Sequence, residues 1–211
     1  MHYATKYGVL LAVLAILAVP SDGLGQATGK VSVDARVGVS LPAGTLADLT
    51  DIGGTAGASL AWNFHPNWAI RADFDYMRLD DGADDLGVTL SPPMNMMFLG
   101  GSFEVNFNAP RLQEHPFKFM LNVGAGVMKM KVDDTFDPGH PANGFDHTYP
   151  TIQGGAKIGY QVEPWLNLFV NGTAYLVIIK SGDTSVFPIP DTFDHAWVFP
   201  VTAGVRLTFL R

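Results

Sequence analysis

Cysteine is absent from this sequence of 211 residues, and basic residues are scarce. Without cysteine the protein forms no disulfide, and it has no thiolate to bind a metal or attack a substrate. Thirteen Lys and Arg stand against 20 Asp and Glu, and the formal net charge is −7. Because phosphate binding needs clustered bases, this balance argues against a nucleic-acid partner. No stretch after residue 27 approaches the length of a transmembrane helix, and no long helical period is present.

The first 27 residues have the pattern of a secretory signal peptide. A short basic region carries Lys6, an apolar run extends from Gly8 to Val19, and small residues end at Ala27. A run of about twelve apolar residues is short for a spanning helix, so cleavage is favoured over an N-terminal membrane anchor. We expect 1–27 to be a signal peptide and 28–211 to be one exported domain.

The rest of the chain alternates between apolar and polar residues. The clearest case is the last segment, where apolar residues at odd positions from Val201 to Phe209 alternate with polar or small residues at even positions. Successive side chains of a strand point to opposite faces, so the pattern predicts two-faced strands. Eight such segments occur, at 30–41, 54–64, 68–78, 95–107, 117–132, 151–162, 166–178 and 197–209. They predict an all-β domain of eight antiparallel strands.

The connections between these strands differ in length. Those at 42–53, 79–94, 133–150 and 179–196 are long, whereas those at 65–67 and 163–165 are tight turns. Long loops on one side and short turns on the other are typical of up-and-down barrels in the bacterial outer membrane. The even strand number puts both ends of the domain on the short-turn side, and we expect the last strand to close against the first.

Three features favour a membrane barrel over a soluble, lipocalin-like barrel with its apolar face inside. The polar face is rich in Gly, Ser, Asn and Thr, unlike the Lys- and Glu-rich surface of a soluble protein. Strands of about ten to 13 residues, tilted near 40°, span the apolar band of about 25 Å. Aromatic residues gather beside the short turns, where a girdle at the membrane–water interface is expected. The predicted girdle contains Trp62, Phe64, Trp68, Phe107, Phe117, Phe119, Tyr160, Trp165 and Phe209.

The chain resembles the OmpA/OmpX-like eight-stranded outer-membrane barrels of Gram-negative bacteria in pattern and topology over 28–211. The most specific element is a C-terminal signal read by the barrel assembly machinery in that family. It corresponds here to Thr202, Gly204, Leu207 and Phe209, followed by Leu210 and Arg211 rather than ending on the aromatic residue. The resemblance implies a location in the outer membrane, contact with its lipid and lipopolysaccharide, and insertion by that machinery.

The predicted register directs charged residues of both signs into the lumen. An eight-stranded barrel is just wide enough for side chains to fill it, and buried charges need partners. The favoured hypothesis is a structural ion-pair network that plugs the barrel, and the alternative is a narrow polar pore. The predicted lumen network contains Asp34, Arg36, Arg71, Asp73, Asp75, Glu104, Lys118, Lys157 and Arg206.

The predicted long loops are strongly acidic, with Lys180 as their one base. Such loops could recruit divalent cations, although 80–85 lacks the rest of a calcium-binding loop. His140, His147 and His195 lie among these acids without the spacing of a metal site, so we expect no resident metal or other cofactor. The acids are Asp48, Asp51, Asp80, Asp81, Asp84, Asp85, Asp133, Asp134, Asp137, Asp146, Asp183, Asp191 and Asp194.

No enzyme signature is present. The sequence has no G-x-S-x-G motif, and Ser181 and His195, which flank the last long loop, are a weak candidate pair for lipid A modification. We therefore expect a monomeric, non-catalytic barrel with a structural or adhesin-like surface role. The alternatives are a small porin-like or hydrophobic-solute transport barrel and, less favoured, a lipid A-modifying enzyme.

Overall fold

The computed structural model describes residues 30–47, 50–65, 67–83, 89–91, 93–107, 116–132, 146–179 and 195–209. The predicted signal peptide, 1–27, lies outside these residues. One short 3₁₀ turn, η1 (Gly44–Leu46), accompanies the strands. The strands are β1 (Lys30–Ala43), β2 (Thr50–His65), β3 (Trp68–Ala83), β4 (Thr89–Ser91), β5 (Met94–Asn106), β6 (Phe117–Val132), β7 (Asp146–Glu163), β8 (Leu166–Ile178) and β9 (His195–Phe209).

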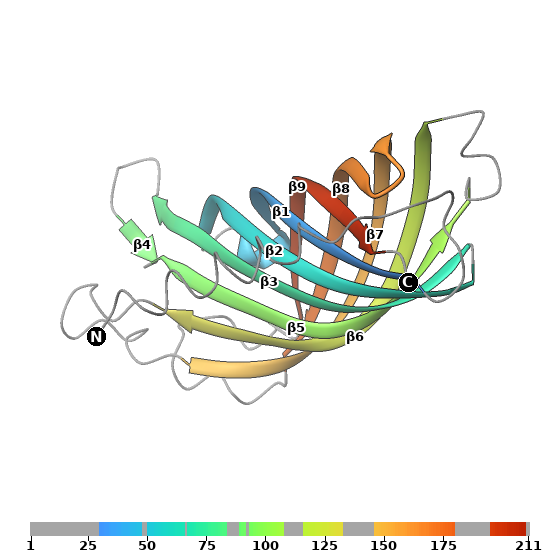
Figure 1. Cartoon of the computed structure of the whole chain (residues 1–211). Helices are drawn as coiled ribbons and strands as arrows, with labels where there is room; N and C mark the ends of the chain where they lie inside the picture. Colours follow the sequence, from blue (N-terminus) through green and yellow to red (C-terminus); the bar gives the residue numbers. More distant parts are fainter. Residues whose placement is uncertain are drawn as a thin grey trace, which may run out of the picture.

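Eight of these strands form a closed ring (Figure 1). Each pairs antiparallel with its neighbours in chain order, and β1 pairs with β9 from Val31↔Phe209 to Ala43↔Trp197. The short strand β4 is outside the ring and pairs only with the end of β3. The predicted eight-stranded, all-antiparallel barrel is thus confirmed, including its closure between the first and last long strands.

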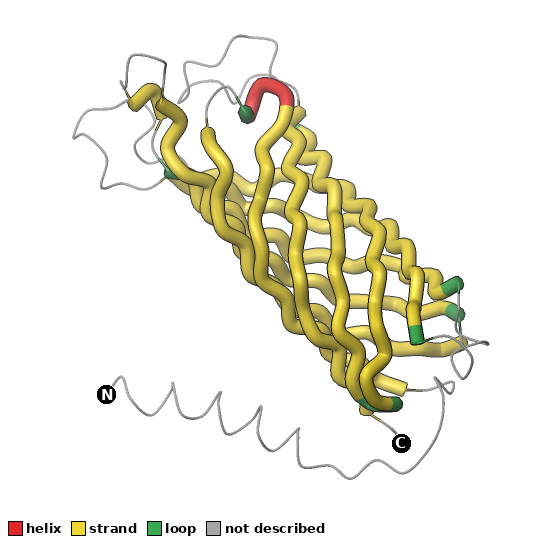
Figure 2. The backbone as a smooth tube through the Cα atoms, turned by 90° about the horizontal axis from the view of Figure 1, so that it is seen from above, coloured by secondary structure: helices red, strands yellow, loops and turns green. Residues whose placement is uncertain are grey.

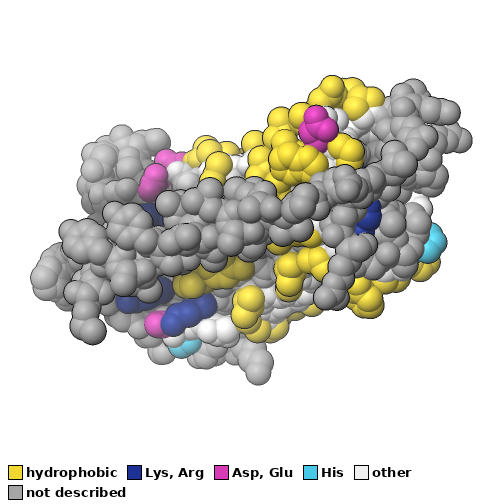
Figure 3. Space-filling view, viewed as in Figure 1, with side chains coloured by type: hydrophobic (Ala, Val, Ile, Leu, Met, Phe, Trp, Pro, Cys, Tyr) yellow, Lys and Arg dark blue, Asp and Glu magenta, His cyan; other side chains and the backbone are white. Residues whose placement is uncertain are grey.

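The apolar face of the sheet is on the outside of the barrel. Val37, Leu99 and Val123 are each more than 60% exposed, whereas neighbours such as Arg36 and Asn122 point inward or are partly covered. Hydrophobic side chains accordingly gather on the part of the wall that is visible in Figure 3. Because apolar area in contact with water is unfavourable, a continuous wall of this kind requires lipid around it. The described residues contain no helix long and apolar enough to cross a membrane.

The two ends of the barrel differ. Figure 2 shows the short turns together at one end, where β9 also finishes, and η1 at the other. At the η1 end the strands are longer than the sequence predicts, since β2 begins at Thr50, β3 continues to Ala83 and β7 begins at Asp146. The outward side chains there become polar, as Lys129, Lys131 and Thr148 are exposed. The apolar-outside alternation therefore ends, while backbone pairing continues beyond the apolar band.

Candidate functional site

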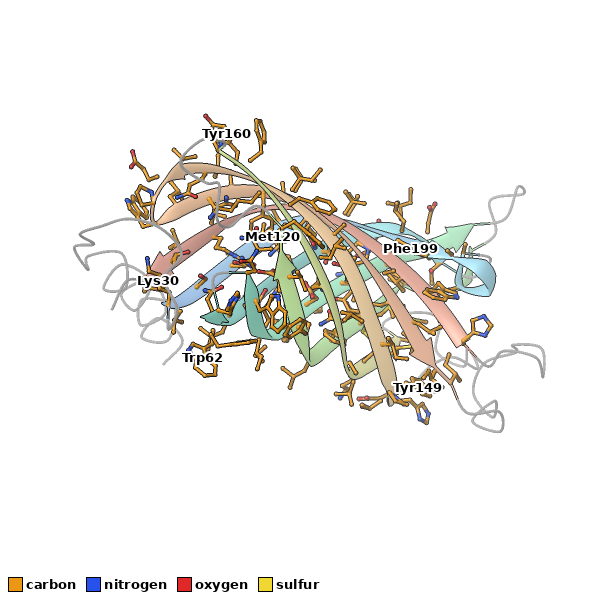
Figure 4. The ribbon with its side chains drawn as sticks, turned by 90° about the vertical axis from the view of Figure 1, so that its right-hand side faces the viewer. Lys30, Trp62, Met120, Tyr149, Tyr160 and Phe199 are labelled. Atoms are coloured by element: carbon orange, nitrogen blue, oxygen red, sulfur yellow. The ribbon has the colours of Figure 1, made fainter. Side chains whose placement is uncertain are left out.

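The lumen of the barrel is divided into a charged half and an apolar half. The charged half lies toward the short turns and contains ten almost fully buried charged side chains. The tenth is Lys30, which was not among the predicted residues. The other nine are the residues of the predicted network, and the structure places all of them inside the barrel: Asp34, Arg36, Arg71, Asp73, Asp75, Glu104, Lys118, Lys157 and Arg206. Figure 4 shows Met120 between the end marked by Lys30 and Trp62 and the end marked by Tyr149 and Phe199.

Arg206 is at the centre of the charged half. Its guanidinium donates two hydrogen bonds to Asp34, at 2.6 and 2.9 Å, and two to Glu104, at 2.7 and 2.9 Å. Both contacts are bidentate, the geometry in which a planar guanidinium binds a carboxylate most strongly. Asp34 on β1 is also the direct cross-strand partner of Arg206 on β9. The strongest group of ion contacts in the lumen therefore crosses the strand pair that closes the barrel.

Two further bases share the same carboxylates. Lys157 donates to Asp34 at 2.6 Å, and its ammonium lies 4.4 Å from the centre of the Phe169 ring. Arg71 donates to Glu104 at 2.7 Å. Each carboxylate is therefore held by at least two cations, which offsets the cost of removing its charge from water.

A second cluster lies closer to the middle of the barrel. Arg36 donates to both carboxylate oxygens of Asp75, at 2.9 and 2.6 Å, and the Tyr175 hydroxyl donates to Asp75 at 2.5 Å. Gly57 pairs with Arg36 on one side and with Asp75 on the other. A Cβ at Gly57 would collide with the Asp75 carboxylate, so the missing side chain makes room for this ion pair.

Asp73 connects the two clusters. It accepts hydrogen bonds from Arg71 at 2.7 Å, Ser102 at 2.5 Å and Gln153 at 3.0 Å, and its carboxylate lies 3.7 Å from Arg36. The network thereby links β1, β3, β5, β7, β8 and β9 across the interior. Within the nine-residue network four acids face five bases, and among the described residues Lys118 is the network base without a carboxylate within ion-pair distance.

The apolar half of the lumen lies toward η1 and was not predicted. The sequence register indicated a polar lumen throughout, but the inward positions of β5 and β6 change to Met and Phe beyond Gly100 and Gly126. The signal was present, because Met94, Met96 and Phe98 continue the inward register of Gly100 and Ser102. The buried residues here are Leu46, Met77, Leu79, Met94, Met96, Phe98, Met128, Met130, Val132, Tyr149, Tyr175, Val177, Ala196 and Val198.

The aromatic residues predicted for the girdle lie at the short-turn end. Trp62, Phe64, Trp68 and Phe103 form a chain of ring contacts with centroids 5.7 to 6.4 Å apart. Along the adjoining part of the wall, from the end of β5 to β7, Phe107 contacts Phe119 at 5.7 Å and Phe117 contacts Tyr160 at 5.3 Å. Trp165 is exposed and Phe209 is partly exposed on the same outer wall.

A second aromatic group occurs at the η1 end, where the sequence interpretation had placed none. Trp197 and Phe199 on β9 stack with centroids 5.9 Å apart and an angle of 6° between their planes. Figure 4 shows Phe199 at the opposite end from Tyr160. Aromatic residues at both ends of the apolar wall match the two interfaces of a bilayer.

The residues of the predicted assembly signal lie on β9. Thr202 is buried, while Leu207 and Phe209 are partly exposed. Gly204 lies beside Phe169, whose ring atom Cζ would be 2.7 Å from a Cβ added at that position. Gly204 therefore leaves room for the ring that Lys157 contacts, a packing role independent of assembly. Leu210 and Arg211 are outside the described residues.

Few of the predicted loop residues can be placed. Asp51, Asp80 and Asp146 are exposed in strands, and His147 and His195 are in β7 and β9 rather than in loops. Asp81 also belongs to β3. The remaining loop acids, Lys180, His140 and Ser181 lie outside the described residues. Within the described part of the chain, no three His, Cys, Asp or Glu side chains gather as a metal site would require.

No protein-family model and no curated protein matches the chain. Solved structures do match. Neisserial surface protein A is 17% identical, with a TM-score of 0.58 over 85% of this chain and 97% of that one. OprG of Pseudomonas aeruginosa is 11% identical, with a TM-score of 0.58 over 90% and 100%. Ail, the attachment invasion locus protein of Yersinia pestis, is 12% identical, with a TM-score of 0.54 over 87% and 100%.

At these identities the likeness is one of fold. Each match extends over nearly the whole of the solved barrel, so the chain contains the complete architecture rather than a fragment of it. The closed ring of eight antiparallel strands agrees with that fold. The chain has the OmpA/OmpX-like fold, a closed eight-stranded antiparallel β-barrel.

Proposed function

We propose that this barrel is a non-conducting anchor that holds acidic segments at the cell surface for adhesive contact. The observation that carries the proposal is the cross-lumen network, in which Arg206 on β9 contacts Glu104 on β5 and Lys157 on β7 contacts Asp34 on β1. An eight-stranded barrel leaves little space beyond its side chains, and here these side chains are tied together by short ionic contacts. A hydrated ion would have to break several of them to pass.

Conductance in planar bilayers tests the closed lumen. We expect the wild-type protein to give no stepwise current, and the Arg206→Ala and Arg71→Ala variants to admit small ions, since each removes a large side chain from the constriction. The matched control is Lys129→Ala, because Lys129 is on the outer face and pairs with Asp146 at 3.0 Å. Steady wild-type current that Arg206→Ala leaves unchanged would contradict the proposal.

The surface role rests on charge. The segments 133–145 and 180–194, which connect strands at the η1 end, each contain three Asp, and Lys180 is their one base. Ail, a protein named for attachment and invasion, has the same fold and has been solved with a heparin analogue. Because heparin is an anion, the acidic segments of this chain favour a different partner: a basic surface, or lipopolysaccharide bridged by divalent cations.

Adhesion assays test this part of the proposal. Cells that produce the full chain should adhere to a polylysine-coated surface more strongly than cells in which 133–145 and 180–194 are shortened. Adhesion to a heparin-coated surface should not differ between them. Equal adhesion to polylysine by both strains, at equal amounts of folded barrel, would rule out the adhesive role while leaving the closed lumen intact.

A transport role is the second candidate, because the lumen toward η1 is apolar. A small hydrophobic solute could enter that half, but it would meet the charged network before it reached the short-turn end. Uptake of a hydrophobic fluorescent dye by vesicles that contain the barrel distinguishes the two functions. The anchor predicts uptake equal to that of empty vesicles.

A further inference from the structure

A row of sulfur and nitrogen donors crosses four neighbouring strands in the apolar half of the lumen. Met77 on β3 is directly opposite Met96 on β5, and Met96 is directly opposite Met130 on β6. Met130 is in turn directly opposite His147 on β7. Directly opposed residues of antiparallel strands point to the same face, with Cβ atoms about 4.5–5.5 Å apart. Three thioethers and one imidazole therefore form a continuous row on the inner wall.

The three methionines of this row are almost completely buried, at 0%, 0% and 2% exposure. Methionine is also concentrated inside the barrel. The chain has eight methionines, and of the seven after Met1 only Met97 faces outward, at 42% exposure. Two of the inward methionines, Met94 and Met128, flank the row on β5 and β6.

The donor set selects for one class of metal. Thioethers are soft, neutral ligands that prefer soft cations, and imidazole is a good ligand for copper. Hard cations such as Mg²⁺ and Ca²⁺ need oxygen ligands, which this row does not provide. Met side chains have three rotatable bonds, and the inner wall of a narrow barrel is concave, so neighbouring sulfurs can turn toward one point.

The row reaches the surface at the η1 end through His147 alone. His147 is the second residue of β7, is partly exposed, and stacks on Tyr149 with ring centroids 6.1 Å apart. Figure 4 shows Tyr149 at the end of the barrel opposite Lys30. An ion arriving from that end would meet the imidazole first and the buried thioethers next.

We propose that Met77, Met96, Met130 and His147 bind one soft monovalent cation, Cu(I) or its analogue Ag(I), in the outer half of the lumen. Binding involves no electron transfer, because the ion enters and remains in the +1 state. The charged network closer to the short turns prevents the ion from leaving through the other end. The site therefore sequesters the metal at the surface side of the membrane and does not transport it.

The test is a competition titration on the full chain purified from membranes in detergent. Cu(I), kept reduced without oxygen, is offered together with a chromophoric Cu(I) chelator, and Ag(I) is measured in parallel by metal analysis after gel filtration. We expect one ion per chain, with Mg²⁺ in large excess having no effect. X-ray absorption of the copper-loaded protein should show sulfur neighbours and one nitrogen neighbour.

Matched substitutions locate the site. Met96→Leu conserves volume and removes the central sulfur, so it should weaken Cu(I) affinity at least tenfold. Met97→Leu makes the same chemical change one residue away on the lipid-facing wall and should leave the affinity unchanged. His147→Gln should weaken binding and remove the nitrogen signal. Heat-modifiable gel migration establishes that each variant is folded.

Two results would overturn the proposal. One is a wild-type chain that loses all Cu(I) and Ag(I) to the chelator. The other is equal affinity in the Met96→Leu and Met97→Leu proteins, which would place any bound ion elsewhere. If Met96→Leu does not fold, Met77→Leu and Met130→Leu take its place, and an absorption spectrum without sulfur neighbours rejects the site whichever variant folds.

Discussion

Replacing Arg206 with Met tests whether the charged network stabilises the barrel. The substitution keeps an unbranched side chain but removes four charge-assisted hydrogen bonds to Asp34 and Glu104. Removing one partner of a buried ion pair costs about 3–5 kcal/mol, because the other charge stays buried. Lys157 still contacts Asp34 at 2.6 Å and Arg71 still contacts Glu104 at 2.7 Å. We therefore expect the substitution to lower the free energy of unfolding by about 3 kcal/mol, the lower end of that range.

Equilibrium unfolding in urea, followed by tryptophan fluorescence in lipid vesicles, measures this free energy. The matched control is Lys129→Met, which breaks the ion pair with Asp146 on the outer face. Both side chains of that pair are nearly half exposed, at 48% and 44%. Exposed pairs contribute about 0–1 kcal/mol, so the control should be close to wild type.

A second substitution identifies the cause of the loss. In the Arg206→Met background, Asp34→Asn removes one of the carboxylate charges left by the first change, and it should recover part of the lost stability. The same Asp34→Asn change in the wild-type background should destabilise the barrel, because Arg206 then loses a partner. Two results would refute the reasoning. One is an unfolding free energy of Arg206→Met within about 1 kcal/mol of wild type. The other is a double variant whose loss of stability equals the sum of the losses in the two single variants.

Three further predictions follow from the same contacts. Gly57→Ala should lower the unfolding free energy by about 1–3 kcal/mol, since a Cβ there meets Asp75, whereas Gly54→Ala, with no atom within 4 Å of its Cβ, should have little effect in the same urea titration. Tyr175→Phe should cost about 1.5–3 kcal/mol by losing the hydrogen bond to Asp75, measured as a lower urea midpoint at an unchanged slope. The membrane-extracted chain should migrate differently on gels when boiled and unboiled, and identical migration would contradict a closed barrel.

The sequence predicted the barrel because a strand in a membrane wall has one unambiguous signal. Residues such as Val201 and Thr202 alternate between lipid and lumen, and nothing else in the chain competes with this period of two. The loop lengths predicted which end of the barrel carries the long loops. The even strand number predicted that the first and last strands pair, as β1 and β9 do. The strand ends at the η1 side were harder to predict, because outward residues there are polar and the alternation disappears before the pairing does.

The interior could be predicted only as a set of residues. Periodicity indicates which side chains face inward, but not that Arg206 lies between Asp34 and Glu104, which are 172 and 102 residues away in the chain. Those distances depend on the stagger between strands, which the alternation does not encode. The methionine row was missed for another reason. Met94 lies in the predicted loop 79–94, and Met96 lies at the start of the predicted strand 95–107, where the sequence analysis did not assign side chains to the inward face.

The pairing of Asp34 with Arg206 has a consequence for the assembly of the barrel. These residues belong to the first and last long strands, so neither finds the other until the whole chain has been made and the sheet curls round. In a sheet that is still open, Asp34 and Arg206 are not paired with each other. Moving unpaired charges into lipid is energetically unfavourable. A slip of one residue between β1 and β9 would turn one of the two toward lipid. The ion contact between Asp34 and Arg206 therefore favours closure of the complete barrel with β1 and β9 in the correct register.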